Sequence, residues 1–260
     1  MRFHISAMLL LGVLVTTSRV ASTSTKKPVP KPNSAARVWH TAAPGATAPR
    51  ASNGLPMLVI HSLNTNDRAE LTPFRKDGGF SAADLDRAAF VVREPGSGNR
   101  YPIEPRLVDL VYRLSTHFDA PEIRVVSCYR TPTGKSRSNH GRGRAIDFVV
   151  PGASDEDVAK VAREFGFVGV GIYPTSGFLH MDVRDRSYFW IDRSGPGKKN
   201  RARGILPEVA HKSDLLALAR GEKPAPPFFI GTTVDTGPSA SDGVSVDETD
   251  DEDNDEAVSP

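Results

Sequence analysis

Apolar residues fall into short regular blocks between about Leu55 and Asp192 and are sparse on either side of that region. Blocks rich in β-branched and other apolar residues, bounded by Gly, Pro and Ser, are typical of strands. The pattern predicts strands at 57–61, 122–128, 144–150, 167–173 and 178–183. Residues 144–150 are apolar on both faces of the expected strand except at Asp147, which indicates a strand buried on both sides.

Helices are predicted where apolar residues recur with helical spacing. Ser81, followed three residues later by Asp84, resembles a capping box and predicts a helix toward Val92. A second helix is expected where apolar positions share one face, at Leu107, Leu110, Val111, Leu114 and Phe118. Ser154 can cap a third helix, and a short fourth one is expected near 213–220. These elements predict an α+β fold with a small, mainly antiparallel sheet and helices packed around it.

The two ends of the chain differ from the middle. Residues 1–22 combine Arg2, an apolar stretch and small residues, as in a signal peptide, although an uncleaved membrane anchor is an alternative. Residues 23–54 are rich in Pro, Ala, Ser and Thr and are expected to form a disordered linker. The folded domain is expected at 55–192, a partly ordered extension at 193–232 and a disordered acidic tail at 233–260.

Composition narrows the classes of function. The 260 residues carry a net charge of only +2, which gives no support for nucleic-acid binding. The chain has one cysteine, Cys128, so an intrachain disulfide is excluded and a stabilising metal becomes more plausible in an exported protein. We expect Cys128 itself to be a buried, inert thiol.

Two predicted strands carry polar residues that need partners. A buried carboxylate such as Asp147 requires a cation, several hydrogen bonds or a metal. In the strand 178–183, alternation places His180 and Asp182 on one face, with Arg184 just beyond them. Two imidazoles and one carboxylate, for which His140, Asp147 and His180 are candidates, form a common ligand set for catalytic zinc. From spacing alone, an ion pair beside two ordinary histidines is an equally open interpretation.

Several motifs in order resemble one family, the YcbK-like murein endopeptidases, which belong with the D-alanyl-D-alanine carboxypeptidases and the hedgehog signalling domain to one zinc superfamily. The segments that carry the resemblance are 127–132 (SCYRTP), 138–147 (SNHGRGRAID), 169–174 (GVGIYP) and 178–182 (FLHMD). The likeness extends over roughly 56–190. It implies a hedgehog-like and D-Ala-D-Ala-peptidase-like fold.

The resemblance also implies roles for individual residues. One zinc ion per chain would be held by His140, Asp147 and His180. Arg130 would stabilise the substrate or the developing oxyanion, although a structural ion pair is the alternative. The residues expected to contact substrate are Arg130, Ser138 and Tyr173. For Ser138, an ordinary turn serine is equally open.

The general base is not identified by the resemblance. Carboxypeptidase relatives have a Glu where this chain has Gly177, and other relatives have a His where it has Phe178. Asp182 is the nearest acidic candidate. It could take a proton from water, or it could hold the imidazole of His180 in place.

Together these observations predict a monomeric zinc peptidase, exported to the periplasm or cell envelope, that cuts the peptide part of peptidoglycan as an endopeptidase. Contact with the membrane is expected only through an uncleaved signal. Two alternatives stay open, namely a carboxypeptidase that removes terminal D-amino acids and a zinc-containing domain that binds the wall without catalysis.

Overall fold

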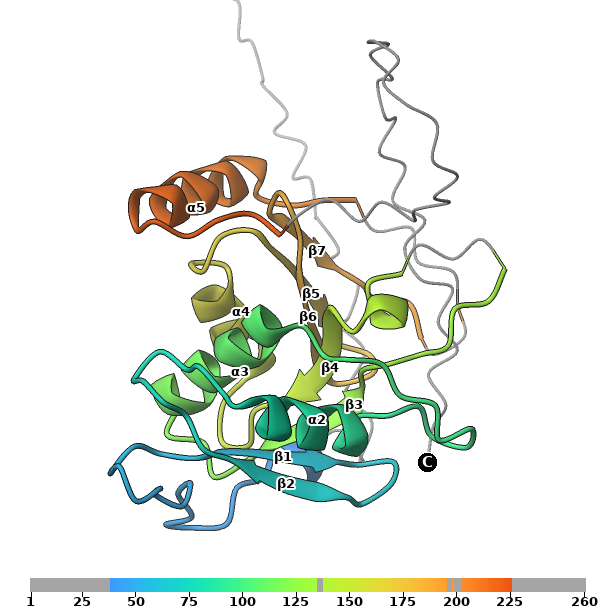
Figure 1. The fold of residues 1–260 in the computed structure, drawn as a ribbon. Coiled ribbons are helices and arrows are strands. Elements are labelled where there is room, and N and C mark those ends of the chain that lie inside the picture. Colours follow the sequence, from blue (N-terminus) through green and yellow to red (C-terminus); the bar gives the residue numbers. More distant parts are fainter. Residues whose placement is uncertain (1–37, 135–137, 196–197, 199–202, 226–260) are drawn as a thin grey trace, which may run out of the picture.

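The protein was analysed as a computed structural model, which describes residues 38–134, 138–195, 198 and 203–225. The strands are β1 Leu58–Ser62, β2 Arg68–Leu71, β3 Ile123–Ser127, β4 Ala145–Val149, β5 Val168–Tyr173, β6 Phe178–Val183 and β7 Tyr188–Ile191. The helices are α2 Ala82–Val91, α3 Pro105–His117, α4 Asp155–Ala162 and α5 Pro207–Ala219, with a short 3₁₀ turn, η1, at His140–Arg142 (Figure 1). The predicted signal peptide and acidic tail lie outside the described residues.

The strands form one sheet in the order β2-β1-β3-β4-β6-β5-β7. Four of the six neighbouring pairs are antiparallel, and the pairs β1–β3 and β5–β7 are parallel. The predicted α+β class and the mainly antiparallel sheet are therefore confirmed. Two strands were not expected, β2 and β7, and they form the two edges of the sheet.

Helices α2, α3 and α4 lie along one face of the sheet (Figure 1). The core between them contains the predicted apolar face of α3 and the alternate residues of the central strands, such as Ile146, Phe148, Leu179 and Met181. The turn η1 lies on the other side of β4, away from α3 and α4 (Figure 1). One face of the sheet is therefore sealed by helices, and the other is available for a site.

Local signals explain where two of these helices begin. The side chain of Ser81 accepts a hydrogen bond from the backbone N–H of Asp84, as the capping-box pattern predicted. Ser154 accepts the equivalent bond from Asp157 at the start of α4. Both bonds satisfy an N–H group that would otherwise lack a partner in the first turn.

The packed part of the chain begins before Leu55. Residues 38–54 fall within the stretch assigned to a linker, yet Arg124 donates hydrogen bonds to the backbone oxygens of Val38, Trp39 and Thr41 at 3.2, 2.8 and 2.9 Å. His40 also lies 3.0 Å from Asp155 at the start of α4. The segment is thus attached to the domain from residue 38 onward.

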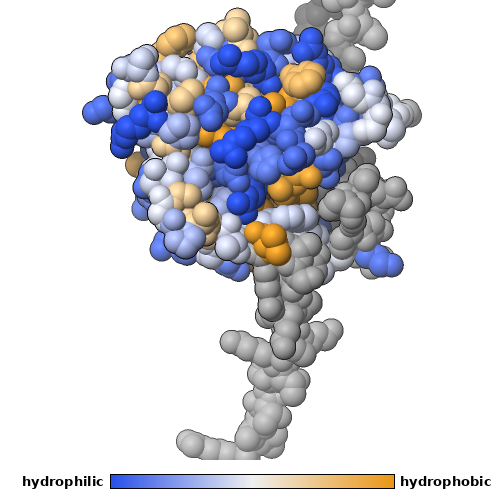
Figure 2. Space-filling model, turned by 90° about the horizontal axis from the view of Figure 1, so that it is seen from below, coloured by the Kyte–Doolittle hydropathy of each residue, from blue (hydrophilic) through white to orange (hydrophobic). Residues whose placement is uncertain are grey.

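At the other end, α5 packs against β7 and is longer than the predicted helix near 213–220. Asp214 on α5 accepts hydrogen bonds from the backbone N–H groups of Phe167 and Ser187 at 2.6 and 3.0 Å. Among the described residues, no helix combines the length and apolarity needed to cross a bilayer. Viewed from below, the surface is mostly hydrophilic, with hydrophobic residues in small separate patches (Figure 2).

Candidate metal centre

The open face of the sheet brings together residues from two neighbouring strands. In the antiparallel pair β4–β6, Asp147 lies directly opposite His180. On β4's other side, Ser127 of β3 lies opposite Asp147. Directly opposed residues in a sheet point to the same face. The register therefore places the carboxylate of Asp147 and the imidazole of His180 side by side.

The third member comes from η1, which precedes β4. His140 Nε2 lies 3.2 Å from His180 Nδ1, and Asp147 Oδ1 lies 2.9 Å from His180 Nδ1 and 3.6 Å from His140 Nε2. One potential ligand atom from each of the three residues lies within 4.8 Å of the others. All three residues are buried, with exposed fractions of 0%, 4% and 3% for His140, Asp147 and His180.

His140 is oriented by the backbone. Its Nδ1 lies 2.6 Å from the carbonyl oxygen of Cys128. Because a carbonyl oxygen can only accept, Nδ1 carries the proton and the lone pair is on Nε2. The lone pair therefore faces His180 and Asp147.

His180 is oriented by a charged partner on its own strand. Its Nε2 lies 2.9 Å from Asp182 Oδ2, while its Nδ1 faces Asp147. Arg184 binds Asp182 through two hydrogen bonds, from Nε at 2.7 Å and Nη2 at 2.6 Å. The imidazole is thus held at Nε2 and offers Nδ1 to the centre of the site.

Electrostatics at the site are dominated by burial and by these ion pairs. Burial lowers the pKa of His180, but hydrogen bonds and charge attraction from Asp147 and Asp182 outweigh it and raise the pKa to about 10. Burial raises the pKa of Asp147, yet His140, His180 and Arg130 together hold it well below the usual value. Burial likewise opposes ionisation of Asp182, and Arg184 and His180 lower its pKa well below the usual value.

Arg130 reaches the same centre from the segment after β3. Its Nη2 lies 2.6 Å from Asp147 Oδ2 and 2.9 Å from His140 Nε2, and its Nε donates to Ser127 Oγ at 2.9 Å. Ser138 lies at the start of the turn, where its Oγ accepts from the backbone N–H of His140 at 3.3 Å. The structure therefore brings Arg130 to the candidate ligands and places Ser138 where it can support the turn that carries His140.

Aromatic side chains from β5, β6 and β7 form a wall beside His180. The rings of Trp190 and His180 have centroids 5.1 Å apart, and Trp190 Nε1 donates to the hydroxyl of Tyr173 at 3.2 Å. Tyr173 is stacked on Phe178 at 4.7 Å. A Cβ added at Gly171 would lie 2.3 Å from the Trp190 ring, so a glycine is needed there for the indole to lie flat on β5.

The predicted inert thiol is buried, because Cys128 is 3% exposed. Burial and the nearby charge of Asp147 raise its pKa to about 12, so it is protonated at neutral pH. The histidines without an expected role lie elsewhere. His61, for example, hydrogen-bonds Asn66 at 2.9 Å on the first strand pair.

Sequence reasoning missed the support that surrounds the histidines. The two glycines of β5 and the Ser127 hydroxyl lie at the site, but none of the three was assigned a role there. The Gly169-Val-Gly171 spacing was a usable signal. Glycines two apart on a strand lie on one face and mark the close approach of other groups.

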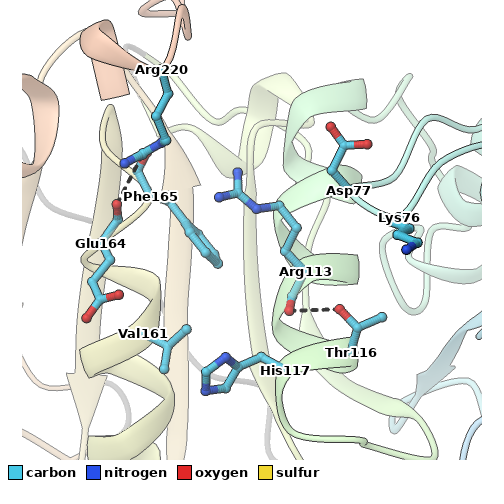
Figure 3. A pocket seen from close by; sticks show the side chains of 9 residues that line it. All are labelled: Lys76, Asp77, Arg113, Thr116, His117, Val161, Glu164, Phe165 and Arg220. Carbon is cyan, nitrogen blue, oxygen red and sulfur yellow. Dashed lines mark hydrogen bonds between the residues drawn. The ribbon is translucent and has the colours of Figure 1, made fainter. Parts of the chain in front are cut away.

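A separate hollow lies at α3, α4 and the end of α5. It has a volume of about 490 Å³, and its lining includes Arg113 and His117 of α3 and Phe165 after α4 (Figure 3). None of the residues that line it is a candidate ligand of the metal centre. The metal centre is therefore distinct from this hollow in both position and chemistry.

The donor set fits a zinc ion. Nitrogen ligands about 2.0–2.1 Å from a tetrahedral zinc lie roughly 3.3 Å apart. The distance of 3.2 Å between His140 Nε2 and His180 Nδ1 agrees with this value. Each nitrogen lies on the side of its ring opposite the group that orients the ring, which is the Cys128 carbonyl for His140 and the Asp182 carboxylate for His180. A histidine ligand whose second ring nitrogen is hydrogen-bonded to a backbone carbonyl or a carboxylate is common at metal sites.

Comparison with known proteins identifies the family. The family described as peptidoglycan L,D-endopeptidase MepK matches residues 50–188, which is more than half of the chain. The chain belongs to this family. The resemblance to the YcbK-like murein endopeptidases is thereby confirmed.

Two curated relatives have the same description. The probable peptidoglycan L,D-endopeptidase MepK of Haemophilus influenzae is 29% identical over 140 residues, which cover 49% of this chain and 75% of that protein. Peptidoglycan L,D-endopeptidase MepK of Escherichia coli K12 is 27% identical over 140 residues, which cover 49% of this chain and 76% of that protein. No solved structure matches this chain significantly. Helix α5 and Trp190 lie beyond the matched residues of the family.

Proposed function

We propose that this chain is an exported zinc peptidase that hydrolyses amide bonds in the peptide part of peptidoglycan, acting as a murein endopeptidase. Membership of the MepK family supports the substrate class and the periplasm or cell envelope as its location. The observation that carries the mechanism is the convergence of His140, Asp147 and His180 within 4.8 Å on the open face of the sheet.

The three residues would hold one zinc through His140 Nε2, His180 Nδ1 and a carboxylate oxygen of Asp147. Three protein ligands leave one coordination position open, as in catalytic zinc sites. Zinc bound there would polarise the scissile carbonyl and lower the pKa of a water molecule to about 7. This set of ligands also accounts for the burial of the Asp147 carboxylate in an otherwise apolar strand.

Arg130 is suited to bind negative charge beside the metal. Its guanidinium keeps its charge at all relevant pH values and offers several donors. The side chain is 24% exposed, so it can be reached from the open face. We assign it to the oxygen that becomes negative during attack on the carbonyl, or to a carboxylate of the peptide. Ser138 and Tyr173 are proposed to border the substrate.

Of the two roles left open for Asp182, the geometry supports the orienting one. Its carboxylate is 1% exposed, accepts from His180 Nε2 and is bound at both oxygens by Arg184. It lies on the side of the imidazole away from the ligand atom Nδ1. A carboxylate with these partners and a strongly lowered pKa is a poor proton acceptor for water. We therefore propose that Asp182 orients His180.

A digestion of purified sacculi by the full-length protein tests the function. Products would be resolved by mass after incubation with and without a chelator, with the Asp147→Asn variant as a matched control. Loss of crosslinked dimers that requires metal and Asp147 is the expected result. Release of free D-amino acids alone would identify a carboxypeptidase, and intact sacculi beside a zinc-loaded protein would identify a binding domain.

A further inference from the structure

We propose that Arg184 is a positioning residue of the metal centre, which fixes the ligand His180 by clamping Asp182 inside a pocket that Gly169 leaves open. The inference rests on the proposed function, because it assumes that His180 binds the metal. Arg184 would not touch the ion itself. It would act by holding Asp182, which in turn holds the ligand His180.

The clamp has little freedom. Arg184 Nε donates to Asp182 Oδ1 at 2.7 Å and Nη2 donates to Oδ2 at 2.6 Å, so the planar guanidinium fixes the plane of the carboxylate. The backbone N–H of Gly169 adds a third donor to Oδ1 at 3.3 Å. Oδ2 accepts from His180 at 2.9 Å. A carboxylate held in this way fixes the orientation of the imidazole ring and the position of its proton.

The pocket for this pair exists because β5 has no side chain at residue 169. Gly169 lies opposite Asp182 in the β5–β6 pair. A Cβ added there would lie 2.4 Å from Asp182 Oδ2 and 2.7 Å from Arg184 Nη2, both far inside van der Waals contact. Any other residue would therefore displace the ion pair. This need for space, and not backbone conformation, explains the glycine.

Two aromatic side chains of β7, Tyr188 and Trp190, border the pocket at the edge of the sheet. The guanidinium carbon of Arg184 lies 5.6 Å from the ring centroid of Tyr188 and 5.7 Å from that of Trp190. Trp190 in turn contacts His180. The side chain of Arg184 is 20% exposed, compared with 1% for Asp182. The ion pair is therefore largely shielded from water, which strengthens its hold on the imidazole.

A purely structural ion pair would have the same distances, so the test must measure the metal. Zinc dissociation constants would be determined by competition with a coloured chelator for the wild type, Arg184→Met, Arg184→Lys and the control Arg186→Met. Arg186 is exposed and lies two residues further along the same loop. We expect zinc binding to weaken about 10- to 100-fold in Arg184→Met, as is usual when the partner of a ligand is disturbed. The zinc affinity of Arg184→Lys should lie between those of the wild type and Arg184→Met, because an ammonium group keeps the positive charge but cannot bind both carboxylate oxygens in one plane.

Two further variants separate positioning from folding. Arg184→Met leaves the buried Asp182 carboxylate without its guanidinium partner and can destabilise the fold, so the double variant Arg184→Met/Asp182→Asn removes the carboxylate charge as well. We expect its thermal stability to recover while zinc binding stays weak. Gly169→Ala keeps every charge but displaces the pair, and it should weaken zinc binding in the same way.

Cobalt substitution gives a readout that does not depend on affinity or activity. The visible spectrum of the cobalt-loaded protein reports ligand geometry, and we expect it to change in Arg184→Met and Gly169→Ala but not in Arg186→Met. Unchanged spectra and wild-type zinc affinity in folded Arg184 variants would overturn the inference. If the wild type binds zinc but leaves peptidoglycan intact, the proposed function fails while this order of affinities can still hold.

Discussion

The two faces of the central strands are built from neighbouring, equally buried residues but are held together by different interactions. On β4, Phe148 points into the core beneath the helices and is 0% exposed, while Asp147 points to the open face and contacts His180 and Arg130. On β6, Met181 belongs to the core and His180 to the site. One face is held by apolar packing and the other by charge and hydrogen bonds.

The difference shows how function and stability can be separated within a single strand. Residues on the helix side contribute by removing apolar surface from water. Residues on the open side are buried polar groups, whose burial is costly unless each has a partner. Substitutions on the two faces should therefore have different consequences, even between adjacent positions.

The largest effect is expected on the open face. Asp147→Asn keeps the shape of the side chain but removes the charged ligand, so zinc binding should be lost and hydrolysis of crosslinked muropeptides should fall about 1,000-fold or more. Metal content and product formation would be measured together. A variant that binds zinc and cuts normally would contradict the assignment of Asp147.

The next residue tests the opposite face. Phe148→Ala removes a fully buried ring and should lower the free energy of unfolding by about 3–5 kcal/mol. Urea unfolding would measure the loss. The fraction that remains folded should still bind one zinc per chain, because no ligand has changed. Phe148→Leu, which leaves a smaller void, is the matched control and should cost less.

Removal of the charge behind His180 should have an intermediate effect. In Asp182→Asn the imidazole loses its anionic partner, and we expect zinc affinity to weaken about 10- to 100-fold. If Asp182 were the general base, kcat would instead fall sharply even when zinc is saturating. Zinc titration and steady-state kinetics on the same samples distinguish the two results.

The pH dependence of the metal-free protein should reveal His180. Its pKa, near 6.5 in an unfolded chain, is raised to about 10 in the fold, so the protonated imidazole stabilises the metal-free protein fully below about pH 6.5. That stabilisation is lost as the pH rises toward 10. Zinc must displace the proton from Nδ1, so zinc affinity should increase with pH over the same range, by up to about tenfold per unit. Melting temperatures measured over a range of pH, with and without zinc, would show both effects. In His180→Ala, the pH dependence with zinc should no longer differ from that without zinc.

The smallest effect is expected at the single cysteine. Cys128 contributes its backbone oxygen to His140, and its buried thiol forms no disulfide. Cys128→Ala should therefore cost about 1 kcal/mol of stability and leave activity within about twofold of the wild type. Thermal unfolding and sacculus digestion would show this. Loss of activity in a folded variant would mean that the thiol has a chemical role.

Much of the fold followed from periodicity. The alternation in 144–150 and 178–183 correctly separated the core residues from Asp147 and His180, and Ser81 and Ser154 correctly marked helix starts. The edge strands were missed for a physical reason. β2 is only four residues long and alternates exposed and buried positions. β7 pairs in parallel with β5, and parallel strands are not joined by a short hairpin turn that could be recognised in the sequence.

For the site, spacing and family resemblance could name candidate ligands but not their supports. That His140 is held by the Cys128 carbonyl depends on a contact between η1 and the segment after β3, which no pattern within either segment reveals. The pairing of Arg184 with Asp182 was visible only as a shared face. Which atoms meet, and that Gly169 makes room for them, depends on the register between β5 and β6.

The pairing of Asp147 with His180 across β4 and β6 has an evolutionary consequence. Two of the three candidate ligands are placed by backbone hydrogen bonds in the middle of the sheet, so their separation does not depend on the lengths of the connecting loops. Insertions or deletions in those loops can therefore reshape the approach to these candidate ligands without moving them apart. Relatives could thus acquire new specificities through changes in these loops, while the spacing between Asp147 and His180 stays the same.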